Sequence, residues 1–266
     1  MLKPSLTADQ MAQLLSTATK AAQAAAVPIQ AYFEQQDLHV IAKSDGSPVT
    51  QADREAEDLI RVHLLSQSAV GPLDILGEER GLQGPGTRWR WLVDPIDGTR
   101  SFVRGIPLFG TIIALVDTQE NVPLIGVIHL PILGMTYSAA KGQGARCQGE
   151  RLQLSHDQKL QDTIIGVGDF AQFQDAQREQ DYHRLLTLSG YVRGYTDCFG
   201  HSLVVNGALG AMLDPALNPW DILATQVLIE EAGGRMVLRP SRTSNKVDAL
   251  FGNSAIVDTI ARELAF

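Results

Sequence analysis

The sequence predicts a layered α/β fold, and three patterns along the chain support this prediction. An alanine-rich segment of helical spacing comes first, short apolar runs separated by Gly, Pro or Asn follow, and strand and helix patterns then alternate. With 266 residues, of which 44% are hydrophobic, the chain can bury a large core. We expect either one domain or two closely joined halves.

Two helices are expected in the first quarter of the chain. Residues Leu6 to Gln35 place apolar side chains at helical spacing and predict a long packing helix perturbed at Pro28. Residues Asp53 to Leu65 predict a second helix. The loop Lys43 to Thr50 precedes it, and its Asp-Gly and Ser-Pro steps are turn signals.

The middle of the chain predicts an antiparallel meander, because short apolar runs are separated by turn residues. The expected strands are Thr111 to Asp117, Pro123 to Leu130 and Met135 to Ala140. Residues Lys141 to Gly144 then predict a hairpin turn without a catalytic role. A phosphate cradle is disfavoured there because the Walker pattern is absent.

Beyond Leu160 the strand and helix patterns alternate, which is typical of layered α/β architecture. The expected order is strand Thr163 to Val167, helix Phe173 to Ser189, strand Tyr191 to Tyr195, helix Cys198 to Asn206, strand Ala208 to Leu213 and helix Pro219 to Ala232.

A hydrophobic strand beginning at Trp91 runs into two carboxylates, Asp94 and Asp97, followed by Gly98 and Thr99. Carboxylates three residues apart at a strand end can share hard cations, which prefer oxygen ligands. The Gly-Thr step opens a turn or short helix whose N–H groups suit a phosphate. The alternative is structural: Asp94 caps a helix, Pro95 is its first residue, and Asp97-Gly98 forms an ordinary turn.

Two further acidic sites weaken that structural alternative. The segment Ile75 to Glu79 is a strand that ends in acids, and Asn218 to Asp221 places a third acid at an element boundary. Carboxylates around one cleft repel one another, and divalent cations relieve that repulsion. Mg²⁺ is the expected ion and Mn²⁺ a possible substitute, whereas zinc is disfavoured because no His or Cys lies in these motifs.

Composition excludes several other classes of protein. The net charge of −8 argues against binding nucleic acid through its phosphates. Cys147 and Cys198 are too few and too far apart in sequence for a zinc knuckle or a disulfide framework. Residues Met1 to Gln10 lack a signal-peptide pattern, and no apolar run approaches a membrane span of roughly 20 residues. We expect a cytoplasmic protein without membrane partners.

Three motifs together resemble a known family. Gly77-Glu78-Glu79, the Asp-Pro-Ile-Asp-Gly-Thr run of residues 94–99 and Pro219-Trp220-Asp221 are similar to the motifs of the inositol monophosphatase superfamily, whose members are magnesium-dependent, lithium-sensitive phosphomonoesterases. The resemblance extends from Lys43 to Gly234. The continuation Arg100 to Thr111 most resembles histidinol-phosphate phosphatases, whereas plain inositol phosphatases more often continue with Thr-Asn-Phe and bisphosphate nucleotide phosphatases with Lys-Glu-Phe.

The resemblance implies a fold and a set of metal ligands. The fold is an α-β-α-β-α sandwich of the inositol monophosphatase and fructose-1,6-bisphosphatase type, formed by one domain over residues 1–266. An α+β half (about 1–157) and an α/β half (158–266) would flank the active site. The implied ligands of two or three Mg²⁺ ions are the side chains of Glu78, Asp94, Asp97 and Asp221 and the carbonyl of Ile96.

The resemblance also implies how the attacking water molecule is activated. The Thr99 hydroxyl would orient the attacking water, Asp53 would accept the Thr99 proton, and Glu78 would also touch the water. Gly98 and Thr99 would offer backbone N–H groups to the phosphate. The structural alternative for Asp53 is an N-cap of the helix that it begins.

The expected activity is Mg²⁺-dependent hydrolysis of a small phosphate monoester, favouring L-histidinol phosphate of histidine biosynthesis over myo-inositol monophosphate. A metal- or phosphate-binding module without catalysis is the non-enzymatic alternative. A haloacid-dehalogenase-type phosphatase is disfavoured, because its two aspartates are two residues apart whereas Asp94 and Asp97 are three apart. A homodimer is implied by the relatives.

Substrate choice is assigned to acids around the expected cleft. Asp97 and Asp221 are expected to contact the substrate as well as metal. Asp197 is the first candidate for binding the cationic alcohol part of histidinol phosphate, and Asp214 is the second. Asp197 has an equally simple structural role as the cap of a helix starting at Cys198. Among the scattered histidines, only His201, beside Asp197, suggests a functional role.

Overall fold

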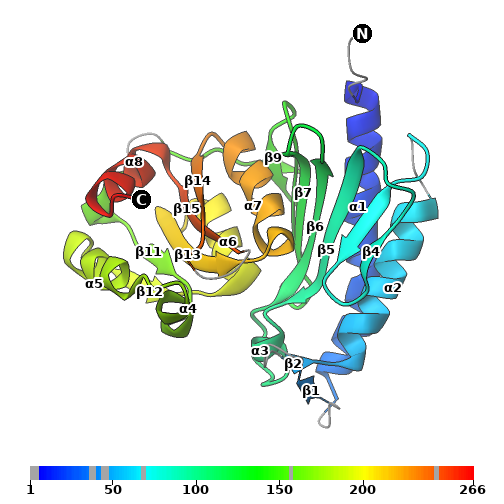
Figure 1. The fold of residues 1–266 in the computed structure, drawn as a ribbon, viewed down its shortest axis with the longest axis horizontal. Coiled ribbons are helices and arrows are strands. Elements are labelled where there is room, and N and C mark those ends of the chain that lie inside the picture. Colours follow the sequence, from blue (N-terminus) through cyan, green and yellow to red (C-terminus); the bar gives the residue numbers. More distant parts are fainter. Residues whose placement is uncertain (1–5, 36–39, 43–47, 67–69, 156–157, 243–245) are drawn as a thin grey trace.

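Helices and sheets alternate in five layers in the computed structural model of the chain (Figure 1), which describes residues 6–35, 40–42, 48–66, 70–155, 158–242 and 246–266. The order is two helices, an eight-stranded sheet, two helices, a five-stranded sheet and three outer helices. The predicted α-β-α-β-α sandwich is therefore confirmed.

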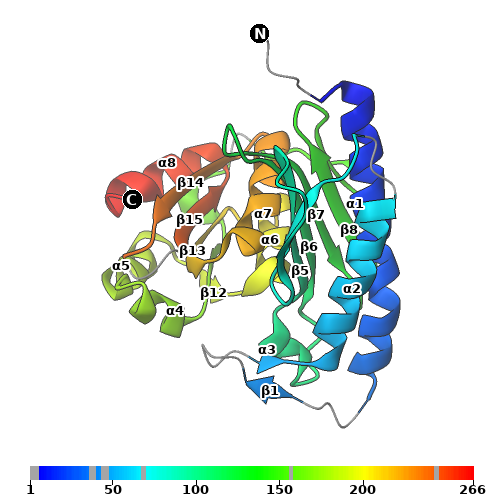
Figure 2. The ribbon, with the colours of Figure 1, turned by 45° about the vertical axis from the view of Figure 1, so that its right-hand side comes forward.

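Helices α1 (Ala8–Phe33) and α2 (Gln51–Ser66) form the first layer and cover the outer face of the large sheet (Figure 2). Thr7 caps α1 in a capping box with Gln10. The buried face of α1 is rich in alanine, which lets the helix backbone lie close to its neighbours. The helix continues through Pro28, so the expected helix is confirmed with that proline inside it.

The large sheet has the strand order β10-β9-β8-β7-β6-β5-β3-β4. Strands β5 to β10 pair antiparallel in sequence order, whereas β3 pairs parallel with β5. The expected meander and the hairpin turn at residues 141–144 are both confirmed. The strands are β3 (Asp74–Gly77), β4 (Gly81–Gln83), β5 (Trp89–Asp97), β6 (Gly110–Asp117), β7 (Val122–Leu130), β8 (Met135–Ala140), β9 (Ala145–Cys147) and β10 (Glu150–Arg151).

A two-stranded ribbon, β1 (Ile41–Ala42) and β2 (Pro48–Val49), precedes α2. Residues 43–47 of the expected loop lie outside the described residues.

Helices α6 (Asp197–Val205) and α7 (Pro219–Glu231) form the middle layer. They pack between the two sheets, and one hydrophobic core joins side chains of the large sheet, such as Ile112 and Ile128, to Met212 and Ile222 from the C-terminal half. A shared core of this kind holds the two halves in a fixed relation, which positions a site built from both.

The small sheet has the order β12-β11-β13-β15-β14, with β11 parallel to both of its neighbours and β15 antiparallel to both of its own. A separate core packs the outer helices against it. The remaining elements are β11 (Ile165–Val167), β12 (Val192–Gly194), β13 (Ala211–Leu217), β14 (Arg235–Pro240), β15 (Val247–Gly252), the 3₁₀ turn η1 (Leu160–Asp162) and helices α4 (Phe170–Asp175), α5 (Glu179–Leu188) and α8 (Ser254–Glu263).

The expected single helix from Phe173 to Ser189 is wrong. The chain forms α4 and α5 instead, with a break at residues 176–178. Gln177 takes a left-handed φ of +55° at the break, and the buried guanidinium of Arg178 donates there to Asp248 on β15 at 2.5 Å and to Asp181 at 2.7 Å. A buried charge requires such partners, and these contacts accompany the break.

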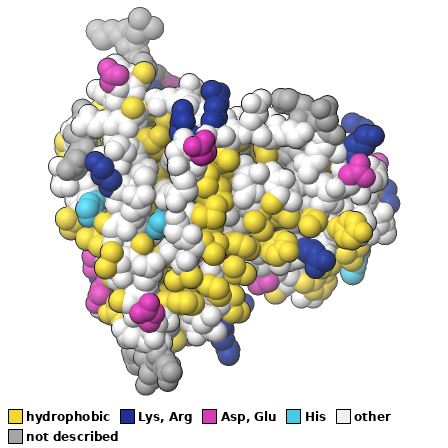
Figure 3. Space-filling model, turned by 180° about the vertical axis from the view of Figure 1, so that it is seen from behind, with side chains coloured by type: hydrophobic (Ala, Val, Ile, Leu, Met, Phe, Trp, Pro, Cys, Tyr) yellow, Lys and Arg dark blue, Asp and Glu magenta, His cyan; other side chains and the backbone are white. Residues whose placement is uncertain are grey.

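The molecule carries hydrophobic side chains in a band near the middle of its back face (Figure 3). Within the described part of the chain, no helix combines the length and the apolar character that crossing a bilayer requires.

Candidate active site

A cavity of about 340 Å³ lies where the ends of β3 and β5 meet the N-terminal ends of α6 and α7. The N-terminal half contributes Glu78 and the segment 94–101 to its walls, and the C-terminal half contributes Asp169, Asp197 and Asp221. The cavity is therefore shared by the two halves and is strongly acidic.

Strand β5 carries the first two acids, and its pairing with β6 becomes irregular between them. Its register with β6 shifts between Asp94 and Asp97, and Gly98 follows at φ +87°, a conformation that favours glycine. The short helix α3 (Thr99–Phe102) begins directly afterwards. The structural alternative of a helix capped by Asp94 and begun by Pro95 is wrong, since both residues belong to β5.

Asp94 is buried, and its Oδ1 atom meets no hydrogen-bond partner within the described part of the chain. Burial and the nearby charges of Glu78, Asp97 and Asp221 raise the pKa of Asp94 well above its usual value. A buried carboxylate oxygen without a donor, among like charges, is chemically suited to a cation, so this position fits a metal ligand.

Asp97 links the two halves of the chain. Its Oδ2 atom accepts a hydrogen bond of 2.5 Å from the backbone N–H of Cys198, in the first turn of α6. Burial, together with the charges of Asp197 and Asp221, still raises its pKa well above the usual value. The Oδ2 atom of Asp97 therefore lies at the positive, N-terminal end of α6, and its Oδ1 atom remains available to a group in the cavity.

Asp221 lies in the first turn of α7, behind Pro219 at the first helical position. Its Oδ2 atom accepts from the backbone N–H of Asn218 at 2.7 Å, in a capping box that fixes the side chain. Burial raises its pKa to about 7. Carboxylate oxygens of Asp94, Asp97 and Asp221 all lie within 4.8 Å of one another.

Glu78 follows β3, and its backbone N–H donates to the Val93 carbonyl on β5 at 3.0 Å. Its side chain lines the same cavity. The Ile96 carbonyl accepts the Thr99 hydroxyl at 2.9 Å and Ile96 also lines the cavity. The structure therefore brings all five sequence-predicted ligands to one site, and an all-oxygen donor set suits a hard divalent cation.

Asp53 and Thr99 also meet. The Thr99 hydroxyl lies 3.4 Å from Asp53 Oδ1, while the other oxygen of Asp53 accepts from the Thr50 hydroxyl at 2.6 Å and the Thr50 N–H at 2.7 Å. The N-cap alternative for Asp53 is wrong, since α2 begins at Gln51 and Asp53 reaches back to the preceding Thr50. Two donors on one oxygen fix the other oxygen toward Thr99.

Asp197 lines the cavity, and its side chain does not cap α6. Its φ of +58° is rare for a non-glycine residue, and its Oδ2 atom accepts the Thr196 hydroxyl at 2.8 Å. Burial raises its pKa to about 6. The carboxylate is accordingly held at the edge of the cavity, next to the metal cluster.

Asp214 is not among the residues that line the cavity. It is buried in β13, where its Oδ2 atom lies 3.1 Å from His201 Nε2, and His201 Nδ1 lies 2.9 Å from the Thr225 hydroxyl. His201 is thus fully engaged inside the fold. The two residues lie behind the wall of the cavity, and the structure does not support a direct substrate contact by Asp214.

Sequence reasoning missed several residues that line the cavity. Asp169 follows the parallel strand β11, and acids after parallel strands are a usable signal, because binding sites form at the carboxyl ends of such strands. Lys246 precedes β15 without any pattern that marks it. Lys246 and Arg100 bring positive charge to an otherwise acidic cavity, where an anionic group could be held.

Comparison with known proteins agrees with this geometry. The model of the inositol monophosphatase family matches residues 10–262. The chain is 40% identical over 204 residues to a histidinol-phosphatase of Chlorobaculum parvum (76% of this chain, 77% of the relative) and 37% identical over 211 residues to an inositol-1-monophosphatase of Mesorhizobium japonicum (76% of each). The fold superimposes on the extragenic suppressor protein suhB from Bartonella henselae with a TM-score of 0.83, at 28% identity, covering 94% of this chain and 97% of that one. This chain belongs to the inositol monophosphatase family.

Proposed function

We propose that this chain, a phosphatase of the inositol monophosphatase family, hydrolyses L-histidinol phosphate with the help of Mg²⁺. The observation that carries the metal-dependent chemistry is the cluster of Asp94, Asp97 and Asp221, three acids whose pKa values are all raised. One buried and two partly buried carboxylates this close together repel one another, and bound cations would relieve that repulsion.

Five oxygen donors would hold the ions: Glu78, Asp94, Asp97, Asp221 and the Ile96 carbonyl. Such ions, whether Mg²⁺ or Mn²⁺, neutralise phosphate charge and lower the pKa of a water molecule that they hold. Inhibition of phosphate release by tens of millimolar Li⁺, roughly the range in which a weak cation site fills, belongs to the same proposal.

The residues beside the cluster would orient the reactants. Hydrolysis forms a bond between the water oxygen and phosphorus and breaks the P–O bond to the alcohol, so that of the two protons of the water one ends on the alcohol and the other on the phosphate. Thr99 would take a proton from the water as it passes its own proton to Asp53 Oδ1, 3.4 Å away. Backbone N–H groups of Gly98 and Thr99, at the start of α3, would hold the phosphate.

The choice of substrate depends on Asp197. Histidinol phosphate carries a protonated amine and an imidazole, and a carboxylate held at the cavity edge binds such a group through charge-assisted hydrogen bonds. Neutral inositol cannot offer an equal partner to that charge. The name of the Chlorobaculum parvum relative also favours this substrate, whereas that of the Mesorhizobium japonicum relative keeps myo-inositol monophosphate as the second candidate.

A phosphate-release assay with Mg²⁺ tests the proposal on four substrates: histidinol phosphate, inositol 1-phosphate, fructose 1,6-bisphosphate and adenosine 3',5'-bisphosphate. We expect the highest kcat/KM with histidinol phosphate. A higher kcat/KM for inositol 1-phosphate would transfer the assignment to the second candidate. No release from any substrate would favour the metal- or phosphate-binding module.

Asp197→Asn should lower kcat/KM for histidinol phosphate by about tenfold to a hundredfold, the worth of one or two charged hydrogen bonds. Glycerol phosphate, whose alcohol is neutral, is the matched substrate and should be hydrolysed almost as before. Because the pKa of Asp197 is about 6, the preference of the wild-type enzyme for histidinol phosphate should also fall as the pH drops below 6. If kcat/KM fell equally for both substrates, Asp197 would support hydrolysis of any substrate and would not select histidinol phosphate.

The family resemblance implies a homodimer, and the two cysteines far apart in sequence favour a reducing compartment. We propose a homodimer that works in the cytoplasm, and light scattering of the purified protein measures the first of these.

A further inference from the structure

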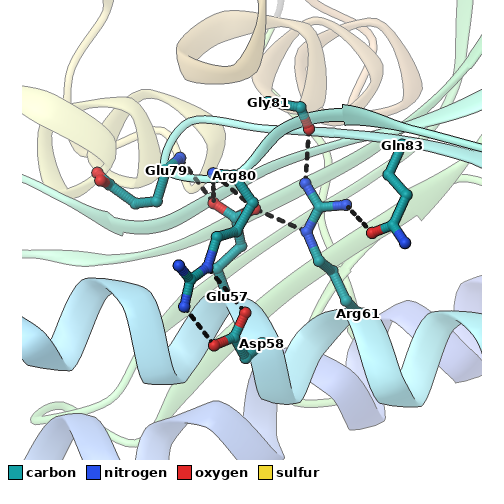
Figure 4. Close-up of polar contacts among 7 residues, drawn as sticks. All are labelled: Glu57, Asp58, Arg61, Glu79, Arg80, Gly81 and Gln83. Atoms are coloured by element: carbon teal, nitrogen blue, oxygen red, sulfur yellow. Dashed lines mark hydrogen bonds and ion pairs between the residues drawn. The ribbon is translucent and has the colours of Figure 1, made fainter.

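The turn that carries Glu78 is held from below by a buried carboxylate of α2. Glu57 is 0% exposed, and its two oxygens accept hydrogen bonds from the backbone N–H groups of Glu79, at 2.7 Å, and Arg80, at 3.3 Å (Figure 4). The preceding N–H, that of Glu78, donates to Val93 on β5 at 3.0 Å. Three consecutive N–H groups are thus fixed, and the peptide planes on both sides of the Glu78 Cα cannot rotate freely.

Arg61, one helical turn after Glu57, completes the support. Its Nε donates to Glu57 Oε1 at 2.7 Å, and its Nη2 donates to the Gly81 carbonyl at 2.6 Å, on the far side of the same turn (Figure 4). Arg61 is only 6% exposed, so each charge depends on the other for compensation. The pair therefore ties α2 to both ends of the turn between β3 and β4.

Gly77 shows how closely this carboxylate approaches the turn. A Cβ atom at Gly77 would lie 2.0 Å from Glu57 Oε1 and 2.3 Å from its Cδ atom, far inside van der Waals contact. The glycine has an ordinary negative φ, so the requirement is steric. The close approach of Glu57 therefore explains why the first residue of the Gly-Glu-Glu motif is a glycine, and no contact with the cavity is needed to explain it.

The helix α2 also carries Asp53, one turn before Glu57 and on the same face. Asp53 faces Thr99, while Glu57 supports the turn that carries Glu78. One rigid helix therefore spans two parts of the active site that lie far apart in sequence.

We propose that Glu57 is a positioning residue, which acts through the turn at residues 78–80 to hold the Glu78 carboxylate in the direction required for binding divalent cations. The inference rests on the proposed function, since Glu78 is a ligand only if the site holds metal. Removing a residue that orients a metal ligand typically lowers the affinity for the metal about tenfold to a hundredfold.

Glu57→Gln is the sharpest test, because it keeps the shape of the side chain and removes its charge. Donors reach both carboxylate oxygens, so either orientation of the amide turns its NH₂ group toward a donor. Mn²⁺ binding, measured by electron paramagnetic resonance on the free full-length protein, should weaken about tenfold to a hundredfold. The Mg²⁺ concentration for half-maximal phosphate release should rise by a similar factor.

Asp58→Asn is the matched control. Asp58 is the next residue on α2 and pairs with the Arg80 side chain of the same turn, but at the surface, where the two side chains are 53% and 44% exposed (Figure 4). Its two hydrogen bonds with Arg80 come from the guanidinium Nε and Nη2 atoms and not from the backbone N–H of the turn. Its Mn²⁺ dissociation constant should stay within about twofold of wild type.

The outcomes separate the two proposals. A folded Glu57→Gln protein that binds Mn²⁺ like wild type, or that loses thermal stability without a change in Mn²⁺ affinity, overturns the positioning role and leaves the proposed function intact. If that variant does not fold, Gly77→Ala displaces the same carboxylate from the other side and should weaken Mn²⁺ binding equally. Wild-type protein that neither binds Mn²⁺ nor releases phosphate overturns both proposals.

Discussion

Asp94→Asn should lower kcat by more than about 10³-fold, or about 4 kcal/mol of activation free energy. Asp94 is the buried member of the carboxylate cluster, and its unpartnered Oδ1 atom is available to a cation. The amide keeps the shape but removes the negative charge that two ions would share. Phosphate release in saturating Mg²⁺ measures the effect.

The same substitution should not harm the metal-free fold. Burial and like charges raise the pKa of Asp94, so its ionised form destabilises the native state at neutral pH. The asparagine variant should therefore unfold at the same or a higher temperature than wild type without divalent ions, and the difference should shrink as the pH falls and Asp94 becomes protonated. Mg²⁺ should raise the melting temperature of wild type much more than that of the variant. Near wild-type turnover in a folded Asp94→Asn protein would show that Asp94 is not a metal ligand.

Local sequence patterns predicted most of the elements but failed where tertiary contacts decide. Strands β6 to β8 follow from short apolar runs separated by turn residues, and α1 from its apolar spacing. The break between α4 and α5 coincides with the ion pair of Arg178 with Asp248, seventy residues away, which no local pattern records. Strands β14 and β15 and helix α8 went unpredicted, although Asn253 caps α8 with two hydrogen bonds.

The site was more predictable than the fold around it, because its chemistry is concentrated in short motifs. Asp94, Asp97 and Asp221 lie together as their oxygen-rich motifs indicated. Asp214 shows the limit: a carboxylate in a strand next to the motif could equally face the cavity or, as found, His201 inside the fold. Sequence alone does not set that choice, since a bulge near Asp214 shifts the register of β13.

We expect Asp53 and Thr99 to activate the water together. Asp53→Asn and Thr99→Ala should each lower kcat by about 10²-fold or more, the usual contribution of a positioned proton acceptor, and leave KM nearly unchanged. Both act on the nucleophile through one contact of 3.4 Å, so the second substitution should cost little once the first is made. A double-mutant cycle tests this: the single-turnover rate of hydrolysis is measured for wild type, the two single variants and the double variant.

Asp53→Asn combined with Asp197→Asn supplies the control cycle. Asp197 is held by Thr196 and faces the alcohol part of the proposed substrate, while Asp53 is held by Thr50 and faces Thr99. Asp53 and Asp197 share no partner in these hydrogen bonds. The factors by which the two single substitutions lower kcat/KM should therefore multiply in the double variant. If the Asp53 and Thr99 losses multiplied in the same way, the two residues would act independently. The 3.4 Å contact would then be a structural hydrogen bond that aligns α2 with α3, and the acceptor for the proton of water would have to be sought among the other carboxylates of the cavity.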